Sequence, residues 1–193
     1  MAAIALFGTS ADPPTLGHRA LLEGLLTLYP RVATWASDNP LKQHAAPLPV
    51  RSELLGTLVA AIGDPRLEHR QELSSPWTIE TLQRAAERWP EHTLVFVVGS
   101  DLVPQIPRWR SAEAILARCR LAVAPRQGWP LQPHDLEALR QRGARIDPLP
   151  LWIPATASSA VRHVADPAQV PSELRPLLLQ HNLYGFGGRP TSS

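Results

Sequence analysis

AAIALFGTSADPPTLGHRALLEGLLTLYP, residues 2–30, contains the features that decide the fold of this chain. It begins with an apolar run that ends at Gly8, continues through a turn rich in Gly, Pro and Asp, and ends with leucines at helical spacing before Pro30. A short, continuously apolar strand followed at once by a helix is typical of a parallel sheet buried on both faces. The sequence therefore predicts a strand over 2–8 and a helix over 18–29.

The same alternation of apolar runs and helical patterns continues along the chain. It predicts further strands over 31–37, 66–73, 93–101, 119–125 and 144–149, and further helices over 49–63, 78–89, 111–118 and 133–143. Strands separated by helices imply right-handed crossovers, and so a doubly wound, mostly parallel α/β sheet with a C-terminal helical portion. Ligands of such sheets bind beyond the carboxyl ends of the strands, where the strand order reverses. A functional site is therefore expected in the loops that follow the strands.

Composition places the chain among ordinary globular proteins. Its 193 residues are 44% hydrophobic and 19% charged, with a formal net charge of +2, which excludes a disordered chain or a highly charged nucleic-acid coat. The single cysteine, Cys119, excludes a disulfide framework and a cysteine-based metal site. No signal peptide or membrane-spanning run is evident. We expect one domain over 1–193, with a frayed tail from about 186, in the cytoplasm and without nucleic acid or membrane partners.

The turn after the first strand has the makings of an anion site. Gly8, Thr9 and Gly17 surround the start of a helix, whose free N–H groups and positive dipole end favour a phosphate. Thr15 and His18 are three residues apart, so their side chains can project from one face of the first turn toward that anion. The spacing matches neither the P-loop nor the Gly-x-Gly-x-x-Gly fingerprint. The alternative is that Thr15 only caps the helix and His18 lies on the surface.

A second stretch, SSAVR at 158–162, has the same chemistry far along the chain. Ser158 and Ser159 can cap a short helix, and Arg162 adds a planar guanidinium that can bind two phosphate oxygens. On its own the stretch is equally well explained as a serine-capped helix with a solvated arginine. Together with the first turn, it would provide the two anion sites that an enzyme joining two phosphates requires.

The first of these stretches resembles a known family. FGTSADPPTLGH, residues 7–18, is similar to the motif GGxFDPxHxGH of the bacterial nicotinate-mononucleotide adenylyltransferases, within the nucleotidyltransferase superfamily that has a T/HxGH motif. Phe7 stands in place of the first Gly of the motif. Thr15 stands in place of the usual first His, a variant that occurs across the superfamily.

Matches to the same family continue in order along nearly the whole chain. Five further segments each have a counterpart in the family. They are a loop preceding an arginine-bearing helix, an aromatic-Thr stretch, a Gly-x-Asp segment with a spaced Trp, a closing serine motif and a final Leu-Tyr. These segments are 35–55, 75–82, 97–109, 156–164 and 170–185. Lys42 and Arg51 match within the first of them, whereas Leu41 departs from it. Thr156 and Ala157 depart from the closing motif.

The resemblance implies a Rossmann-like nucleotidyltransferase fold and a reaction. The chain would transfer AMP from ATP to nicotinate mononucleotide, giving nicotinate adenine dinucleotide and pyrophosphate in NAD biosynthesis. Mg²⁺ would bridge the phosphates, held mainly by substrate and water, as this ion prefers. The resemblance also implies phosphate-binding roles for His18 and Thr15 (ATP phosphates), for Arg162, Ser158 and Ser159 (departing pyrophosphate), and for Lys42 (a mobile contact).

The resemblance implies roles on the nucleoside side as well. Gly99 and Asp101 end the central strand, and Asp101 would accept hydrogen bonds from ribose hydroxyls, although an Asp there also suits a helix N-cap. Trp109 would stack on the pyridine ring, and Trp77 with Thr78 would recognise its carboxyl group. Core packing is the alternative for both tryptophans.

Three alternatives to this function remain open at the level of sequence. One is transfer to nicotinamide mononucleotide, and another is transfer to a different phosphorylated acceptor, such as a pantetheine phosphate, or cytidylyl transfer on the same scaffold. The third is a nucleotide-binding regulator that kept the fold and lost activity. Intact Thr15, His18 and Arg162 argue against the regulator. The sequence does not decide between a monomer and a homo-oligomer.

Overall fold

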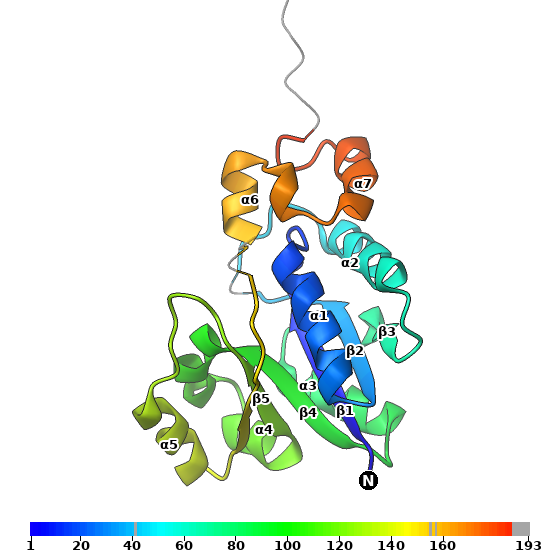
Figure 1. Ribbon diagram of the computed structural model, residues 1–193. Coiled ribbons are helices and arrows are strands. Elements are labelled where there is room, and N and C mark those ends of the chain that lie inside the picture. The colour runs from blue at the N-terminus through cyan, green and yellow to red at the C-terminus, as the bar shows by residue number, and fades with distance from the viewer. Residues whose placement is uncertain (41, 155, 157, 187–193) are drawn as a thin grey trace, which may run out of the picture.

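The computed structural model describes residues 1–40, 42–154, 156 and 158–186, and its central feature is a parallel sheet (Figure 1). Leu41 and Ala157, two of the departures from the family motifs, lie outside the described residues. Within the described part the sheet has six strands in the order β3-β2-β1-β4-β5-β6, and all neighbours are parallel. The strands are β1 (Ala3–Thr9), β2 (Arg31–Ala36), β3 (Leu67–His69), β4 (Thr93–Gly99), β5 (Arg120–Ala124) and β6 (Arg145–Pro148).

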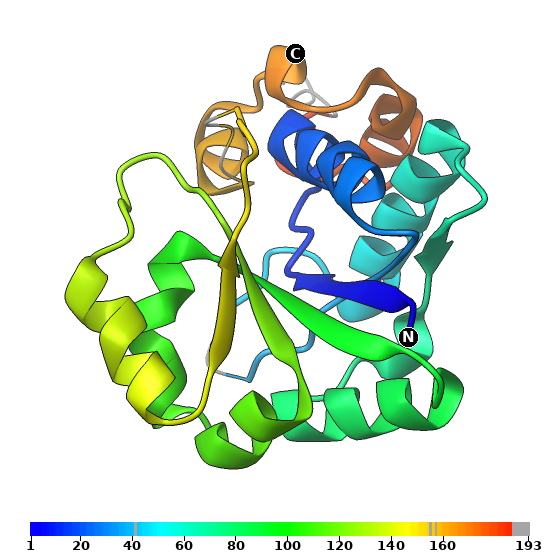
Figure 2. The ribbon, with the colours of Figure 1, turned by 60° about the horizontal axis from the view of Figure 1, so that its bottom comes forward.

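Helices cover both faces of the sheet (Figure 2). The crossover helices are α1 (Leu16–Leu28), α2 (Leu48–Ile62), α3 (Thr78–Arg88), α4 (Ala112–Arg118) and α5 (Pro133–Gln141). Leucines of α1 and α2 pack on one face, with strand residues such as Phe7. Residues of α3, α4 and α5 pack on the other face, with alternate strand residues such as Leu6. Because the strands alternate their side chains between two apolar layers, the central strands β1, β4 and β5 carry apolar residues on both faces.

The predicted elements are confirmed, with small shifts at their ends. The largest shift is at 66–73, where the strand stops at His69 and a 3₁₀ turn, η1 (Gln71–Leu73), follows. This edge strand pairs with β2 alone over three residues, so little of it is fixed by the sheet. After β4, a 3₁₀ helix η2 (Ser100–Arg108) begins at once, and Pro104 and Pro107 lie within it.

The C-terminal portion returns to the face that α1 and α2 cover (Figure 1). It consists of α6 (Ser158–Val164), the 3₁₀ turns η3 (Pro167–Gln169) and η4 (Ser172–Leu174), and α7 (Arg175–Gln180). Val161, Leu174 and Leu178 are fully buried in the same apolar cluster as the leucines of α1. Phe186, which the sequence prediction placed at the start of a frayed tail, packs against this cluster, and 187–193 lie outside the described residues.

The strand order creates the crevice in which ligands are expected. The chain moves from β1 outward to β2 and β3, then crosses back to β4 on the other side of β1. The loops that follow β1 and β4 therefore leave the sheet in opposite directions, which is the arrangement that opens a crevice at the carboxyl edge. Among the described residues, no helix is both long enough and apolar enough to cross a membrane.

Candidate active site

The His18 ring is held at the start of α1 by the Thr9 hydroxyl at Nε2 and by the N–H and the hydroxyl of Thr15 at Nδ1. The backbone N–H of Thr15 donates to His18 Nδ1 at 3.0 Å, so Nδ1 carries no proton. His18 Nε2 lies 2.8 Å from Thr9 Oγ1 and therefore carries the proton that it donates to this hydroxyl. The ring of Phe7, 6.4 Å from that of His18 between centroids, helps to cover it. Burial, with a smaller contribution from the charge of Arg126, lowers the pKa of His18 to about 4, so the ring is neutral at pH 7.

Thr15 and Gly17 are engaged by a segment from the far end of the chain. Thr15 is fully buried, and its hydroxyl donates to the carbonyl of Thr156 at 2.8 Å. The N–H of Gly17 donates to Thr156 Oγ1 at 2.6 Å, and a Cβ at Gly17 would lie 2.9 Å from that oxygen. Both features differ from the prediction, which had Thr15 facing a phosphate and Gly17 making room for one. The glycine instead makes room for the crossing segment, which the sequence pattern does not reveal.

Helix α6 is tied to the loop after β1, so the structure brings the two predicted anion sites together. Ser158 Oγ donates to the carbonyl of Pro13 at 2.8 Å. Arg162 Nη1 donates to the carbonyl of Asp12 at 2.6 Å and lies 3.8 Å from the Asp12 carboxylate. About a third of the Arg162 side chain stays exposed (33%), so the guanidinium can still meet a ligand. Ser159 is exposed in the first turn of the same helix.

On the β4 side, Asp101 folds back over the end of its strand. A Cβ at Gly99 would lie 2.5 Å from Asp101 Oδ1, so the Asp101 carboxylate could keep this position only while residue 99 is glycine. The other carboxylate oxygen of Asp101 accepts a hydrogen bond from Arg126 Nη1 at 2.6 Å. The sequence analysis did not select Arg126. The sequence contained a signal for Arg126 as a site residue, because it directly follows the predicted strand 119–125 and so lies at the same carboxyl edge as Thr9 and Asp101.

Gly8 is set by packing at the end of β1. A Cβ there would lie 2.7 Å from the indole of Trp35 on β2, so the two strands can approach with this ring between them only if residue 8 is glycine. Lys42, in the loop after β2, is exposed.

Arg51 of α2 fastens the loops around the crevice. Its side chain is buried, and its guanidinium donates to the carbonyls of Ala46, Ser10 and Ser37 at 2.7–3.0 Å. Burial lowers its pKa. Because these carbonyls belong to the loops that follow β1 and β2, Arg51 holds the two loops in a fixed relation. The family resemblance included Arg51 as a match, but only the structure shows that it joins these two loops.

The residues predicted to bind the pyridine ring lie on the face of the sheet that α3, α4 and α5 cover. Trp77 precedes Thr78, the first residue of α3, and is 38% exposed. The guanidinium of Arg110 lies 4.9 Å from the centroid of the Trp77 ring. Trp109 is half-buried and packs edge-to-face on Phe96, with ring centroids 6.3 Å apart. Both indoles therefore keep surface that a ligand could contact.

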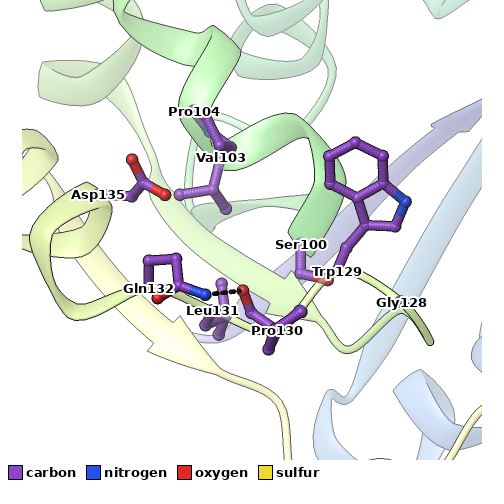
Figure 3. Close-up of a pocket in the computed structure, with 9 residues that line it drawn as sticks. All are labelled: Ser100, Val103, Pro104, Gly128, Trp129, Pro130, Leu131, Gln132 and Asp135. Atoms are coloured by element: carbon purple, nitrogen blue, oxygen red, sulfur yellow. Dashed lines mark hydrogen bonds between the residues drawn. The ribbon is translucent and has the colours of Figure 1, made fainter.

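A cavity of about 270 Å³ lies beside the end of β4 (Figure 3). Its walls come from η2, from the loop after β5 and from the start of α5, and they include the exposed Trp129. None of the predicted site residues lines it, although Ser100 borders Asp101. Within the described part of the chain, no three His, Cys, Asp or Glu side chains gather in a way that could hold a metal ion.

Comparison with known proteins gives the family. A family model described as cytidylyltransferase-like matches residues 6–162. A probable nicotinate-nucleotide adenylyltransferase of Synechocystis sp. is 36% identical, over 94% of this chain and 98% of its own length. The chain belongs to the nicotinate-nucleotide adenylyltransferase family. A member from Thermus thermophilus is 30% identical over 81% of this chain and 82% of its own length. The predicted family and enzyme class, a nucleotidyltransferase, are thereby confirmed.

Solved structures show that the family fold extends over nearly the whole chain. Nicotinic acid mononucleotide adenylyltransferase from Plasmodium falciparum, complexed with NaAD, aligns with a TM-score of 0.77 at 17% identity and covers 96% of this chain and 98% of its own. The same enzyme complexed with APC aligns with a TM-score of 0.75 at 18% identity. At this identity the likeness concerns the fold, and it confirms the predicted nucleotidyltransferase architecture.

Proposed function

We propose that the chain transfers AMP from ATP to nicotinate mononucleotide, releasing pyrophosphate and forming nicotinate adenine dinucleotide. One observation carries the proposal beyond family membership: Ser158 and Arg162 bind the carbonyls of Pro13 and Asp12. These bonds place a cationic helix against the loop that leads into His18. A reaction that joins two phosphates needs two phosphate-binding groups at one crevice, and Arg162 of α6 and His18 of α1 would be these groups.

The chemistry demands little beyond positioning and charge stabilisation. The phosphate of the mononucleotide is already an anion and can attack the α-phosphorus of ATP without a general base. Holding the two phosphates in line can contribute as much as about 7–11 kcal/mol where the geometry is ideal. The protein therefore has to orient the reactants and stabilise the charge that develops on the phosphate oxygens.

His18 supplies a neutral donor for that charge. In the free protein its Nε2–H donates to Thr9, and we propose that an oxygen of the ATP phosphates takes the place of the Thr9 hydroxyl. The bond from the Thr15 N–H to Nδ1 keeps the proton on Nε2 throughout. Thr15 thus acts on the phosphates through the histidine.

Three cations of the loops and of α6 would balance the charge of the triphosphate. Arg162 would bind the departing pyrophosphate, Lys42 would contact the phosphates from the loop after β2, and Arg126 already lowers the pKa of His18 by its charge. Mg²⁺ would neutralise charge on the pyrophosphate as it leaves. We propose that this ion would be held mainly by the substrate phosphates and water, as Mg²⁺ prefers.

The acceptor side is proposed from the exposed indoles. Trp109 would stack on the pyridine ring, and Trp77 with Thr78 would meet its carboxyl group. Asp101 would accept hydrogen bonds from ribose hydroxyls, in exchange for or beside its bond to Arg126. We also propose that the protein works in the cytoplasm, where a buried thiol such as that of Cys119 stays reduced.

The test is an assay of purified protein with ATP and Mg²⁺, measuring pyrophosphate release with each acceptor in turn. We expect the highest kcat/KM with nicotinate mononucleotide and lower values with nicotinamide mononucleotide and phosphopantetheine. Turnover with neither pyridine mononucleotide would refute the proposal. Binding of ATP without turnover on any acceptor would favour an inactive regulator.

Substitution of His18 checks the mechanism in the same assay. His18→Ala should reduce kcat about 10²–10³-fold, as the loss of a preorganised donor to a developing oxyanion does, with a much smaller change in ATP affinity. His134→Ala is the matched control, because this histidine is 78% exposed on α5. Equal losses of kcat and ATP affinity in His18→Ala would mean that the histidine only binds.

A further inference from the structure

Asp12 is a buried carboxylate to which several segments of the chain attach. It is 1% exposed, and its Oδ2 accepts the backbone N–H of Ala45 at 2.8 Å. Its Oδ1 accepts the N–H of Ala46 at 3.1 Å and the hydroxyl of Tyr184 at 2.5 Å. A carboxylate this deeply buried is tolerated only when donors satisfy its oxygens. Here the donors come from the loop after β2 and from the C-terminal segment.

Arg162 lies close to this carboxylate without forming a tight ion pair with it. Its Nη1 donates to the backbone carbonyl of Asp12 at 2.6 Å, while the nearest carboxylate oxygen is 3.8 Å away. The carboxylate and a bound phosphate would compete for the same guanidinium. Three donors already occupy the Asp12 oxygens, which weakens the pull of the carboxylate on Arg162 and leaves that guanidinium for a ligand.

Tyr184 reaches Asp12 from a backbone that is held in an unfavourable conformation. Its φ is +55°, and Asn182 nearby has a φ of +48°, both in the left-handed region that costs a non-glycine residue about 1 kcal/mol or more. Such conformations persist where the surroundings fix them, and they gather at ligand clamps. Leu183, Tyr184 and Phe186 pack against the apolar cluster of α1 and α2, which fixes the segment. Burial and the bond to Asp12 raise the pKa of Tyr184 above its ordinary value, so it remains a donor.

We infer that Tyr184 is a positioning residue for the phosphate site, and that its hydrogen bond to Asp12 keeps Arg162 available for the triphosphate of ATP. Without the hydroxyl, Asp12 Oδ1 would lose its side-chain donor, and the carboxylate would draw the Arg162 guanidinium inward across the present 3.8 Å. The C-terminal segment would thus control ATP affinity without touching ATP. This role rests on the proposed function for Arg162 as a phosphate ligand.

The experiment is a double-mutant cycle on ATP affinity, measured by calorimetric titration of the full chain with Mg²⁺-ATP. Tyr184→Phe should weaken ATP binding about tenfold, the scale of a hydrogen bond to a charged group. In an Arg162→Ala background the same substitution should have no further effect, because the residue through which it acts is gone. Tyr29→Phe is the control, since Tyr29 is the other tyrosine of the chain and lies at the far end of α1.

Each outcome of the cycle decides the inference. Unchanged ATP affinity in Tyr184→Phe, or the same loss in both backgrounds, would overturn it, because a purely structural role would act regardless of Arg162. Phe keeps the ring and its packing, so thermal melting should show a folded variant, and failure to fold would also overturn the assignment. Affinity is measured without an acceptor, so a wild-type chain that binds ATP but transfers nothing would refute the proposed function alone.

Discussion

At the scale of single residues, the site depends on where one proton sits. The N–H of Thr15 can only donate, so its bond to Nδ1 of His18 leaves the proton of the neutral ring on Nε2. The TLGH spacing predicted that His18 and Thr15 lie together in the first turn of α1, and the structure places them there. The sequence did not show that the Thr15 N–H sets the tautomer, because this bond forms only once the first turn of α1 brings the ring back to the Thr15 backbone. Nor did it show that the Thr15 hydroxyl donates to the Thr156 carbonyl, 141 positions away.

The protonation of His18 can be measured directly. In an NMR titration of the histidine rings, the His18 resonances should show the Nε2–H tautomer and titrate with a pKa of about 4, because burial disfavours the charged form. A His18 that titrates near 6.5 would contradict the buried donor, and an Nδ1–H tautomer would contradict the role of Thr15.

The same pKa affects stability in a defined direction. The unfolded chain takes up a proton on His18 as pH falls through about 6.5, whereas the folded chain does not until about pH 4. The unfolded state therefore binds more protons in this window, and the free energy of unfolding should fall as pH drops from 6.5 to 4. The lowered pKa values of His44 and His69, which also follow from burial, act in the same direction.

At the scale of elements, the sequence is informative wherever the signal is local. Gly63 ends α2 in the left-handed conformation at a φ of +69°, where the sequence predicted the end of that helix. The edge strand was predicted too long because Leu73, the second apolar residue of 66–73, packs in a 3₁₀ turn and not in the sheet. The bonds that join elements were not predictable, since Arg51 reads as an ordinary helix arginine until its three carbonyl partners are in place.

Arg51 provides a test of how the loops are joined. Arg51→Leu should lower the free energy of unfolding by about 3 kcal/mol, because it leaves three carbonyls, one in a buried and two in part-buried hydrogen bonds, without their charged donor. Urea unfolding monitored by circular dichroism measures the change. Arg88→Leu, on the exposed side of α3, should stay within about 0.5 kcal/mol of wild type. Equal effects of the two substitutions would contradict the role of Arg51 in joining the loops after β1 and β2.

At the scale of the whole molecule, strand order and the C-terminal portion together make the site. The alternation of strands and helices predicted the doubly wound sheet, and the sheet places Thr9 and Asp101 at one edge. The final third of the chain then brings α6 and Tyr184 to the loop after β1. Motif order along the sequence indicated that these parts belong to one enzyme. Their contacts depend on a chain path that no local pattern contains.

In the proposed reaction the two phosphates are joined directly, without an adenylyl group passing through a side chain. The stereochemical course at the α-phosphorus tests this most directly, using ATP with a chiral α-phosphorothioate and nicotinate mononucleotide as acceptor. One direct displacement predicts inversion of configuration in the dinucleotide product. Retention of configuration would show two successive displacements through a covalent enzyme intermediate, and would contradict direct transfer between the two phosphates.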